Sequence, residues 1–392
     1  MLTALGNVFD IGSGGTPSKK HTEYYDGDIP WVKTGDLKDK DLYVVEDYIT
    51  EKGLKNSSAK MYEPGTVLIA MYGATIGAVS ILRLNACTNQ ACAAFKPCKA
   101  ISPEYLYYFL RSKKQSFIKD GVGGAQPNIS AGYLKKVEID LRPLDEQNET
   151  VTRLNLLDSI IHKRQQEIKN LDNLVKARFV EMFGNPFDPQ KPVAWQVKTI
   201  KDLAESIADG SNVDKTLYKE QGDILFLRIQ NVWCNEFRLD DSVYISEAEN
   251  EVYLDTALKH GDLLITKIGR YYTADSSLGR VSVYLGEDNK ANYSNNIMRV
   301  RFREEINSEF VNALMNLDDY NKYIRRTSVG GTDKRALSKG LIASYPIIVP
   351  SITKQNEFVD FVHQVDKSKV AIQKSLEETQ LLFDSLMQQY FG

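Results

Sequence analysis

Two stretches of the chain repeat their apolar residues with a period of about three and a half positions, which is typical of a helix packed along another helix. The first covers about residues 144–184 and the second about residues 352–392. Each opens just after a proline, Pro143 or Pro350, and each ends on an aromatic residue followed by glycine. The pattern predicts two long helices that pair with each other. The predicted seam consists of Leu154, Leu157, Ile161, Ile168, Leu171, Val175, Val362, Val365, Ile372, Leu376, Phe383 and Leu386.

The segments ahead of the two helices are also related in sequence. Residues 27–34 align with 222–229, residues 65–69 with 261–265, and residues 77–81 with 279–283. The offset grows from 195 at Gly27 and Gly222 to 208 at Phe183 and Phe391, which places small insertions in the second copy, chiefly around residues 270–275. The chain therefore reads as a tandem duplication, in which each half is a globular unit followed by a long helix.

Within each globular unit, short runs of β-branched and apolar residues are separated by turn residues, which favours strands. Strands are expected near residues 28–33, 66–72, 78–82 and 92–96. Ser102 and Pro103 fit the N-cap and first position of a helix over 103–111, with a partner helix over 308–317. Nothing before Leu5 matches residues 195–197, so the first strand of the first unit is expected to be shorter or absent.

The predicted fold class is α+β: two similar mixed α/β domains with antiparallel strands, separated by the paired helices in a pseudo-twofold tandem repeat. The expected boundaries are a first globular domain at 1–143, a first helix at 144–184, a Pro-rich linker at 185–194, a second globular domain at 195–350 and a second helix at 351–392.

Composition narrows the classes of function. The 392 residues carry a net charge of −3, which argues against a simple non-specific nucleic-acid binder. The basic residues nevertheless cluster at matching places in the repeat, over 111–136 and 322–339, which favours a phosphate-facing surface over a merely solvated charged face. No run of 18 apolar residues and no signal pattern is present. Four scattered cysteines without a zinc spacing fit buried thiols in a reducing, cytoplasmic setting without membrane contact.

No catalytic or metal-binding pattern stands out. The turn at residues 12–15 is rich in glycine but opens no apolar helix, so we interpret it as a surface loop, one that approaches phosphate through its backbone N–H groups. The sequences at 185–187 and 167–169 resemble fragments of methylase and nuclease motifs, but they fall in the linker and on the predicted coil. The expectation is a non-catalytic protein with no metal and no cofactor of its own.

In this arrangement the chain resembles the specificity (S) subunit of type I restriction–modification systems. The similarity lies in the segments 12–18, 72–77 and 124–130, in the helix openings at Pro143 and Pro350, each followed within five residues by a glutamine, and in the order of these features over essentially the whole chain. The resemblance implies a target recognition domain in each half, antiparallel pairing of the helices, and a bipartite asymmetric target on double-stranded DNA with an unread spacer. It also implies two methyltransferase (modification) subunits, which would bind S-adenosylmethionine, and a motor/nuclease restriction subunit.

Contacts to DNA are predicted from side-chain chemistry, because Arg, Asn and Gln read base edges while Lys and Arg hold phosphates. The residues proposed for base readout are Lys33, Tyr72, Thr75, Gln126 and Asn128 in the first unit and Arg228, Gln230, Asn231, Lys267, Arg270, Tyr271, Lys334 and Arg335 in the second. The residues proposed for phosphate are Lys19, Lys20, Lys113, Lys114, Arg325 and Arg326.

Two further surfaces are left open. Arg299, Arg301 and Arg303 alternate along one strand face, which faces either DNA or solvent. Leu174 and Phe179 fall outside the seam and indicate an apolar outer face on the first helix, where a methyltransferase subunit would dock.

The alternatives are a specificity subunit for a fused methylase–nuclease or an unpaired copy used to exchange specificity, a two-headed protein-binding adaptor without DNA readout, and an enzyme acting alone. The missing catalytic motifs weigh against the last, and the matched basic clusters weigh against the adaptor.

Overall fold

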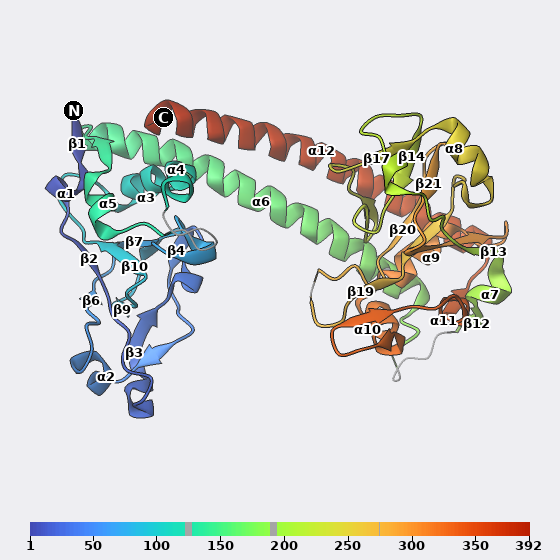
Figure 1. Ribbon diagram of the computed structural model, residues 1–392, viewed down its shortest axis with the longest axis horizontal. Helices are drawn as coiled ribbons and strands as arrows, with labels where there is room; N and C mark the ends of the chain where they lie inside the picture. Colours follow the sequence, from blue (N-terminus) through green and yellow to red (C-terminus); the bar gives the residue numbers. More distant parts are fainter. Residues whose placement is uncertain (122–127, 189–193, 274) are drawn as a thin grey trace. The chain divides into compact units, whose positions relative to one another are not determined.

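The computed structural model describes residues 1–121, 128–188, 194–273 and 275–392 (Figure 1). The chain forms two compact units. The first combines Met1–Gln165 with Gln373–Gly392, and the second is Gln166–Ile372. Each long helix, α6 (Leu144–Phe183) and α12 (Ile352–Phe391), therefore gives one part to each unit.

The first unit is built on two small sheets and a strand pair. A five-stranded sheet has the order β2-β10-β7-β8-β4, a four-stranded sheet has the order β5-β3-β9-β6, and β1 pairs with β11. The strands are β1 (Leu2–Ala4), β2 (Ile11–Ser13), β3 (Tyr25–Val32), β4 (Lys40–Leu42), β5 (Tyr48–Ile49), β6 (Met61–Tyr62), β7 (Val67–Ala70), β8 (Val79–Leu82), β9 (Ala86–Thr88), β10 (Cys92–Phe95) and β11 (Glu138–Asp140). The helices are α1 (Leu5–Val8), α2 (Glu51–Lys55), α3 (Pro103–Ser112), α4 (Lys114–Asp120) and α5 (Ala131–Lys136).

The second unit has a four-stranded sheet of order β13-β22-β18-β20, a three-stranded sheet of order β17-β14-β21, another of order β19-β24-β23, and the pairs β12-β25 and β15-β16. Its strands are β12 (Gln196–Thr199), β13 (Ala204–Asp209), β14 (Ile224–Leu227), β15 (Val232–Trp233), β16 (Glu236–Phe237), β17 (Val243–Ile245), β18 (Leu263–Thr266), β19 (Ile268–Arg270), β20 (Val281–Val283), β21 (Ala291–Tyr293), β22 (Ile297–Phe302), β23 (Val329–Gly330), β24 (Lys334–Ala336) and β25 (Pro346–Val349). Its helices are α7 (Ile200–Leu203), α8 (Glu247–Val252), α9 (Ser308–Met315), α10 (Asp318–Thr327) and α11 (Lys339–Ala343).

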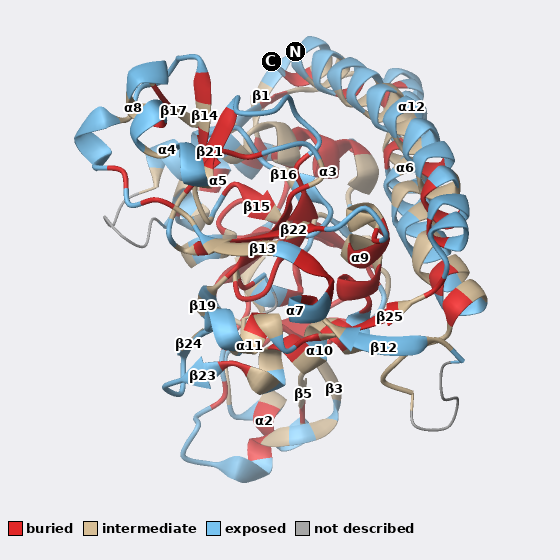
Figure 2. Cartoon of the chain, turned by 90° about the vertical axis from the view of Figure 1, so that its right-hand side faces the viewer, coloured by how far each residue is buried: buried red, intermediate tan, exposed pale blue. Residues whose placement is uncertain are grey.

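Most strand pairs are antiparallel, as predicted, but some are parallel. In the first unit β3 runs parallel to β9 and β4 to β8, and in the second β14 runs parallel to β21. The main core of the second unit combines residues of β18, β20 and β22 with residues of α9 and α10, and Figure 2 shows buried residues on both β22 and α9. The predicted α+β class, a repeated mixed domain joined to two long helices, is confirmed.

The first strand of the first unit is shorter than its counterpart but present. The backbone N–H of Leu5, which follows β1, donates to the carbonyl of Val137 at 2.8 Å. The backbone N–H of Ile200, which follows β12, donates to the carbonyl of Tyr345 at 3.0 Å. The two strand pairs therefore close the two domains in the same way.

A buried glutamine fastens each long helix to its domain. The Gln147 side chain accepts a hydrogen bond from the backbone N–H of Ser102 at 2.9 Å, and its amide donates to the carbonyls of Ala100 and Arg142. Gln355 does the same with Asn307, Glu305 and Pro350. Both glutamines are fully buried, so their bonds satisfy backbone groups that water cannot reach.

That role explains why a glutamine, Gln147 or Gln355, follows within five residues of the proline that precedes each helix. The glutamine is the residue that ties the first turn of the long helix to the segment ahead of α3 or α9.

The long helices pair antiparallel. In the first unit the beginning of α6 and the end of α12 share one core, in which Leu154, Ile161 and Phe383 are buried. In the second unit the end of α6 packs with the beginning of α12, where Val175 and Val362 lie against the same core. All twelve predicted seam residues are buried or partly buried, whereas most of the remaining helix surface is exposed (Figure 2).

The prediction for the outer face of α6 is half right. Leu174 is 47% exposed, but Phe179 is fully buried. The Phe179 ring packs against Phe183, Phe310 and Phe358, with centroids 5.1–5.3 Å away. A strict heptad count misplaced it, because α9 packs on a face of α6 beside the seam.

Candidate nucleic-acid interface

The ribbon β19-β24-β23 of the second unit carries several of the predicted DNA contacts. Its register places Arg270 opposite Lys334 and Gly269 opposite Arg335. The side chains of Arg270 and Lys334 are exposed, and Arg270 lies 3.7 Å from Asp333 in the turn between β23 and β24. We call the surface formed by Arg270, Tyr271, Lys334 and Arg335 the ribbon surface.

Arg335 and Tyr271 support each other within the ribbon surface. The guanidinium carbon of Arg335 lies 4.0 Å from the centre of the Tyr271 ring, a close cation–π contact. The Tyr271 backbone N–H donates to the carbonyl of Asp333 at 2.7 Å, and Arg325 donates to the carbonyls of Tyr271 and Thr273. The predicted residues Arg325, Arg270, Tyr271, Lys334 and Arg335 are thus brought together by the insertion that the sequence alignment placed at residues 270–275.

A polar cleft lies on the same unit. Its lining includes Arg228 and Gln230, together with the three asparagines Asn212, Asn295 and Asn296. The backbone N–H of Lys267, next to the ribbon, donates to the carbonyl of Asn296 at 2.9 Å. This bond joins a residue that lines the cleft to the residue just ahead of β19. The three asparagines were not among the contacts predicted from the sequence.

Some predicted contacts in the second unit have structural roles instead. Asn231 is 1% exposed, and it bonds the Arg228 backbone, the Arg238 carbonyl and Asp241, so its place among base-reading residues is corrected. Gln230, at 3.1 Å, and Arg228 also bind Asp241, and these bonds hold the pKa of that carboxyl below its usual value. Lys267 is largely buried and pairs with Asp209.

The corresponding place in the first unit carries other side chains. Tyr72 and Asn128 form an antiparallel bridge there, where the second unit pairs Ile268 with Ala336, and the Ile129 N–H donates to the carbonyl of Met71 at 3.0 Å. The matching bond in the second unit joins Leu337 to the carbonyl of Lys267 at 2.8 Å. Tyr72 is 41% exposed and Asn128 is exposed, while Thr75 lies in the turn after Tyr72. Gln126 lies outside the described residues.

Of the lysines predicted to contact DNA in the first unit, two are exposed in a turn and three interact with other groups of the chain. Lys19 and Lys20 are exposed in the turn after β2. Lys33 pairs with Asp47 at 2.5 Å and lies over the Trp31 ring. The other two hold their own unit together: Lys113 donates to the carbonyl of Phe391 at 2.5 Å, and Lys114 pairs with Asp39 at 3.0 Å. Arg326, in the second unit, is exposed at the end of α10.

The three arginines at positions 299, 301 and 303 do not share one environment. Arg299 is 5% exposed and donates to the carbonyls of Asp255 and Ala257. Arg301 makes two 2.7 Å bonds to the fully buried carboxylate of Asp262, and Arg303 donates to the carbonyl of Asp202. Arg299 and Arg301 thus tie β22 to neighbouring segments, whereas Arg303 lies just past the strand and is exposed, so the single environment that the alternation predicted is wrong.

The glycine-rich turn is a close backbone crossing. A side chain on Gly14 would meet the carbonyl oxygen of Thr88 at 1.8 Å, and one on Gly210 would meet that of Ser294 at 2.3 Å. The next residue in each unit donates its N–H across the crossing, from Gly15 to Thr88 and from Ser211 to Tyr293, at 2.9 Å. Gly14 is buried, so the interpretation as a phosphate-approaching surface loop is corrected.

No group of three or more His, Cys, Asp or Glu side chains in the described ranges could hold a metal ion. Cys87 and Cys92 are buried, and burial raises the pKa of the Cys87 thiol to about 12, whereas Cys234 is exposed. Among the described residues, no helix has the length and apolar character needed to cross a bilayer.

Comparison with known proteins decides the family. The model of the type I restriction modification DNA specificity domain matches residues 2–170 and again residues 192–380. The chain belongs to this family. Its two matches coincide with the duplication seen in the sequence and in the two sets of equivalent bonds.

Individual relatives agree with this assignment. The chain is 28% identical over 284 residues to the MjaIX specificity subunit of Methanocaldococcus jannaschii, covering 68% of this chain and 65% of that protein. It is 30% identical over 182 residues to the HindI specificity subunit of Haemophilus influenzae, covering 43% and 39%. Each alignment thus spans less than two thirds of the relative.

A crystal structure of a type I restriction–modification S subunit from M. genitalium has a similar fold, with a TM-score of 0.56 and 15% identity over all of this chain and 96% of that one. This likeness concerns the fold alone.

Proposed function

We propose that this chain is the DNA specificity subunit of a type I restriction–modification enzyme and that each unit reads one half of a bipartite, asymmetric target. The observation that carries the proposal is the family match in both halves, combined with two equivalent domains that present different polar surfaces at the same place. An asymmetric target requires two domains that are attached to the long helices in the same way but present different side chains to the DNA.

The ribbon surface has the chemistry for the second half-site. A two-stranded β-ribbon fits the major groove, and Arg is the commonest reader of guanine there. Arg335 is held over Tyr271, so less side-chain freedom is lost on binding than for a free arginine. Arg270 and Lys334 lie exposed at the open end of the ribbon, where phosphate or base edges could reach them.

In the first unit, Tyr72 and Asn128 are the corresponding candidates. Asn can pair with adenine through both of its amide groups. Lys19 and Lys20 would position the phosphate backbone, because they are exposed and carry no sequence information of their own.

The paired helices set the distance between the half-sites in this proposal. A helix of 40 residues rises roughly 60 Å, which exceeds the roughly 34 Å of one turn of DNA. Methyltransferase subunits would supply S-adenosylmethionine and the chemistry, and a motor/nuclease subunit would add cleavage. A change in coil length should alter the spacer and leave both half-sites unchanged.

The test is to map methylated bases in cells that carry this gene with its neighbouring methyltransferase gene, and in cells that lack this gene alone. The proposal predicts a split, asymmetric methylation motif that disappears with the deletion. Unchanged methylation, despite confirmed expression of this chain, would contradict it and favour the protein-binding adaptor.

A further inference from the structure

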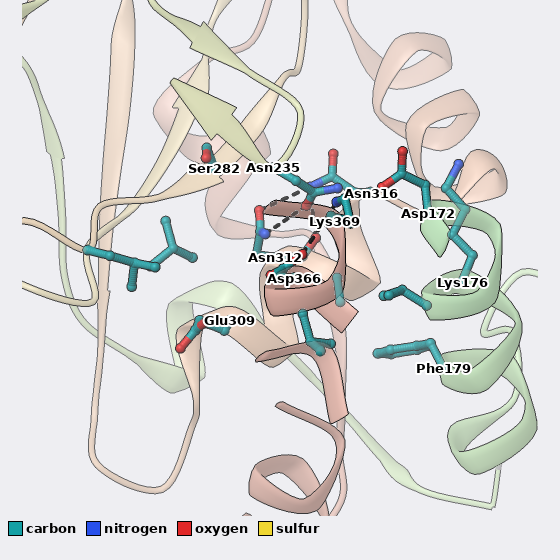
Figure 3. A pocket seen from close by; sticks show the side chains of 15 residues that line it. Asp172, Lys176, Phe179, Asn235, Ser282, Glu309, Asn312, Asn316, Asp366 and Lys369 are labelled. Atoms are coloured by element: carbon teal, nitrogen blue, oxygen red, sulfur yellow. Dashed lines mark hydrogen bonds and ion pairs between the residues drawn. The ribbon is translucent and has the colours of Figure 1, made fainter. Parts of the chain in front are cut away.

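Polar groups of the second unit either bind one another or face outward. Figure 3 shows the first kind around a cavity of about 140 Å³. Lys369 lies 2.8 Å from Asp172 and 3.4 Å from Asp366, and Asn316 donates to Asn235 at 2.8 Å. Because these groups serve each other, we looked for a further ligand contact on the exposed ribbon surface.

The insertion beside the ribbon carries an exposed aromatic residue that the sequence analysis did not select. The offset between equivalent residues rises from 196 at Gly73 and Gly269 to 202 at Gly77 and Gly279, so the second copy has six additional residues in this turn. One of them is Tyr272, which is 73% exposed. Single exposed tyrosines are common on protein surfaces, so the meaning of this one depends on how its neighbours hold it.

The backbone on both sides of Tyr272 is held by one arginine. Arg325 of α10 donates to the carbonyl of Tyr271 at 3.4 Å and to the carbonyl of Thr273 at 3.1 Å. The Tyr271 N–H donates to the carbonyl of Asp333 in the turn between β23 and β24. The insertion is therefore tied to α10 and to the ribbon at the residues that flank Tyr272.

The Tyr272 ring is supported as well. It meets the Tyr271 ring edge to face, with centroids 4.9 Å apart and an angle of 90° between the ring planes. The guanidinium carbon of Arg335 lies 4.0 Å from the centre of the Tyr271 ring. Arg335, Tyr271 and Tyr272 thus form a row whose last member is exposed. A ring placed in this way loses less conformational freedom on binding than a free side chain would lose.

The charge around Tyr272 favours a polyanion as the ligand. The basic side chains Arg270, Arg325, Lys334 and Arg335 outnumber the nearby acids Asp275 and Asp333. Arg270 and Lys334 are exposed beside the insertion. The ring of Tyr272 would therefore reach DNA together with cations that can hold phosphates.

Tyr43 of the first unit is nearly as exposed, at 65%, but its surroundings have the opposite charge. Its hydroxyl donates to Asp41 at 3.3 Å, and Glu46 and Asp47 follow in the segment between β4 and β5. These carboxylates would repel a phosphate backbone. Tyr43 is therefore a matched control for Tyr272.

The chemistry of the major groove indicates what an aromatic ring can recognise there. A two-stranded β-ribbon fits this groove, in which most groups on the base edges are hydrogen-bond donors or acceptors. The apolar group that the base pairs present there is the 5-methyl group of thymine. The apolar face of a tyrosine ring can cover this methyl group, and burying one such group favours binding about fourfold.

We propose that Tyr272 selects a thymine in the second half-site by packing its ring against the thymine 5-methyl group. The inference rests on the proposed function, because it requires the ribbon surface to lie in the major groove. It adds to that function a specificity-determining residue and the base that this residue selects. Arg270 and Lys334 would hold phosphates on either side of the contact.

The experiment measures the affinity of the assembled methyltransferase for its target duplex and for duplexes in which each thymine is replaced, one at a time, by deoxyuridine. Deoxyuridine keeps the base pair and lacks only the methyl group. We expect the wild-type enzyme to bind one of these duplexes about fourfold more weakly than the target. Tyr272→Ala should bind that duplex and the target equally well, whereas Tyr272→Phe, which keeps the ring, and Tyr43→Ala should behave as the wild type does.

Three results would overturn the inference. They are equal binding of all the duplexes by the wild-type enzyme, an undiminished preference for thymine in Tyr272→Ala, and loss of that preference in Tyr272→Phe, since the hydroxyl would then make the contact. The proposed function would survive each of them, provided that the wild-type enzyme still prefers its target to an unrelated duplex. Absence of that preference would contradict the proposed function itself.

Discussion

In the first unit, Tyr72 faces Asn128 across a bridge, whereas at the same place in the second unit Ile268 faces Ala336, and the ribbon that continues from this pair carries Arg270, Lys334 and Arg335. Behind these surfaces the two units share equivalent hydrogen bonds, at the buried glutamines Gln147 and Gln355 and at the backbone N–H groups of Ile129 and Leu337. The difference teaches that the duplication kept the groups that attach each domain to the coil and varied the surface that meets the ligand.

The largest expected effect comes from the coil that both units share. Leu154→Asp places a charge at a fully buried seam position, so we expect a loss of about 3–5 kcal/mol in the free energy of unfolding. Leu156→Asp, on the same helix but 62% exposed, is the matched control and should change little. Chemical denaturation measures both. Equal stability of the two variants would show that the seam was assigned to the wrong face.

Replacing either of the two buried glutamines should lower the free energy of unfolding by a similar amount. Gln147→Ala and Gln355→Ala each leave one backbone N–H and two carbonyls without their partner, and we expect each to cost about 1–3 kcal/mol. Gln364→Ala, at an exposed position of α12, should cost close to nothing. If chemical denaturation shows a large loss of unfolding free energy for only one of the two buried glutamines, the claim that both domains are attached to the long helices in the same way is wrong.

A smaller effect is expected from the exposed lysine of the ribbon. The sequence selected Lys334 for base readout, but its exposed place at the end of the ribbon favours a phosphate contact. Lys334→Ala should therefore weaken DNA binding of the assembled methyltransferase about equally on all sequences and lower the salt dependence of the affinity by about one ion. Lys374→Ala, exposed on α12, should leave the slope unchanged. Binding titrations at several salt concentrations give the slope. An unchanged slope for Lys334→Ala would remove the ribbon end from the phosphate-contacting surface.

The sequence predicted those parts of the fold in which a residue pattern repeats along the chain. The heptad positions, the helix bounds near Leu144 and Ile352 and the cap at Ser102 follow from local chemistry that repeats along the chain. It failed where a partner distant in the sequence decides the environment. The buried bonds of Arg299 and Arg301, the burial of Phe179 and the close crossing at Gly14 all depend on segments that local patterns do not reveal.

The candidate site was predictable in the same partial way. Residue chemistry selected Arg270, Tyr271, Lys334 and Arg335, which the fold gathers, but it also selected Asn231 and Lys113, whose polar groups hold the chain's own backbone. A sequence shows which side chains can donate or accept hydrogen bonds. Which group of the protein each of them binds depends on the folded structure.

The most direct test of the comparison is selection of bound sites from a random DNA library by the assembled methyltransferase carrying wild-type chain, Arg335→Ala or Tyr72→Ala. The account predicts that Arg335→Ala relaxes the bases of one half-site, by about 1–3 kcal/mol per contacted pair, and that Tyr72→Ala alters only the other half-site. If both substitutions change the same half-site, or if neither changes any base preference, the claim that the two units read different halves through these surfaces is wrong.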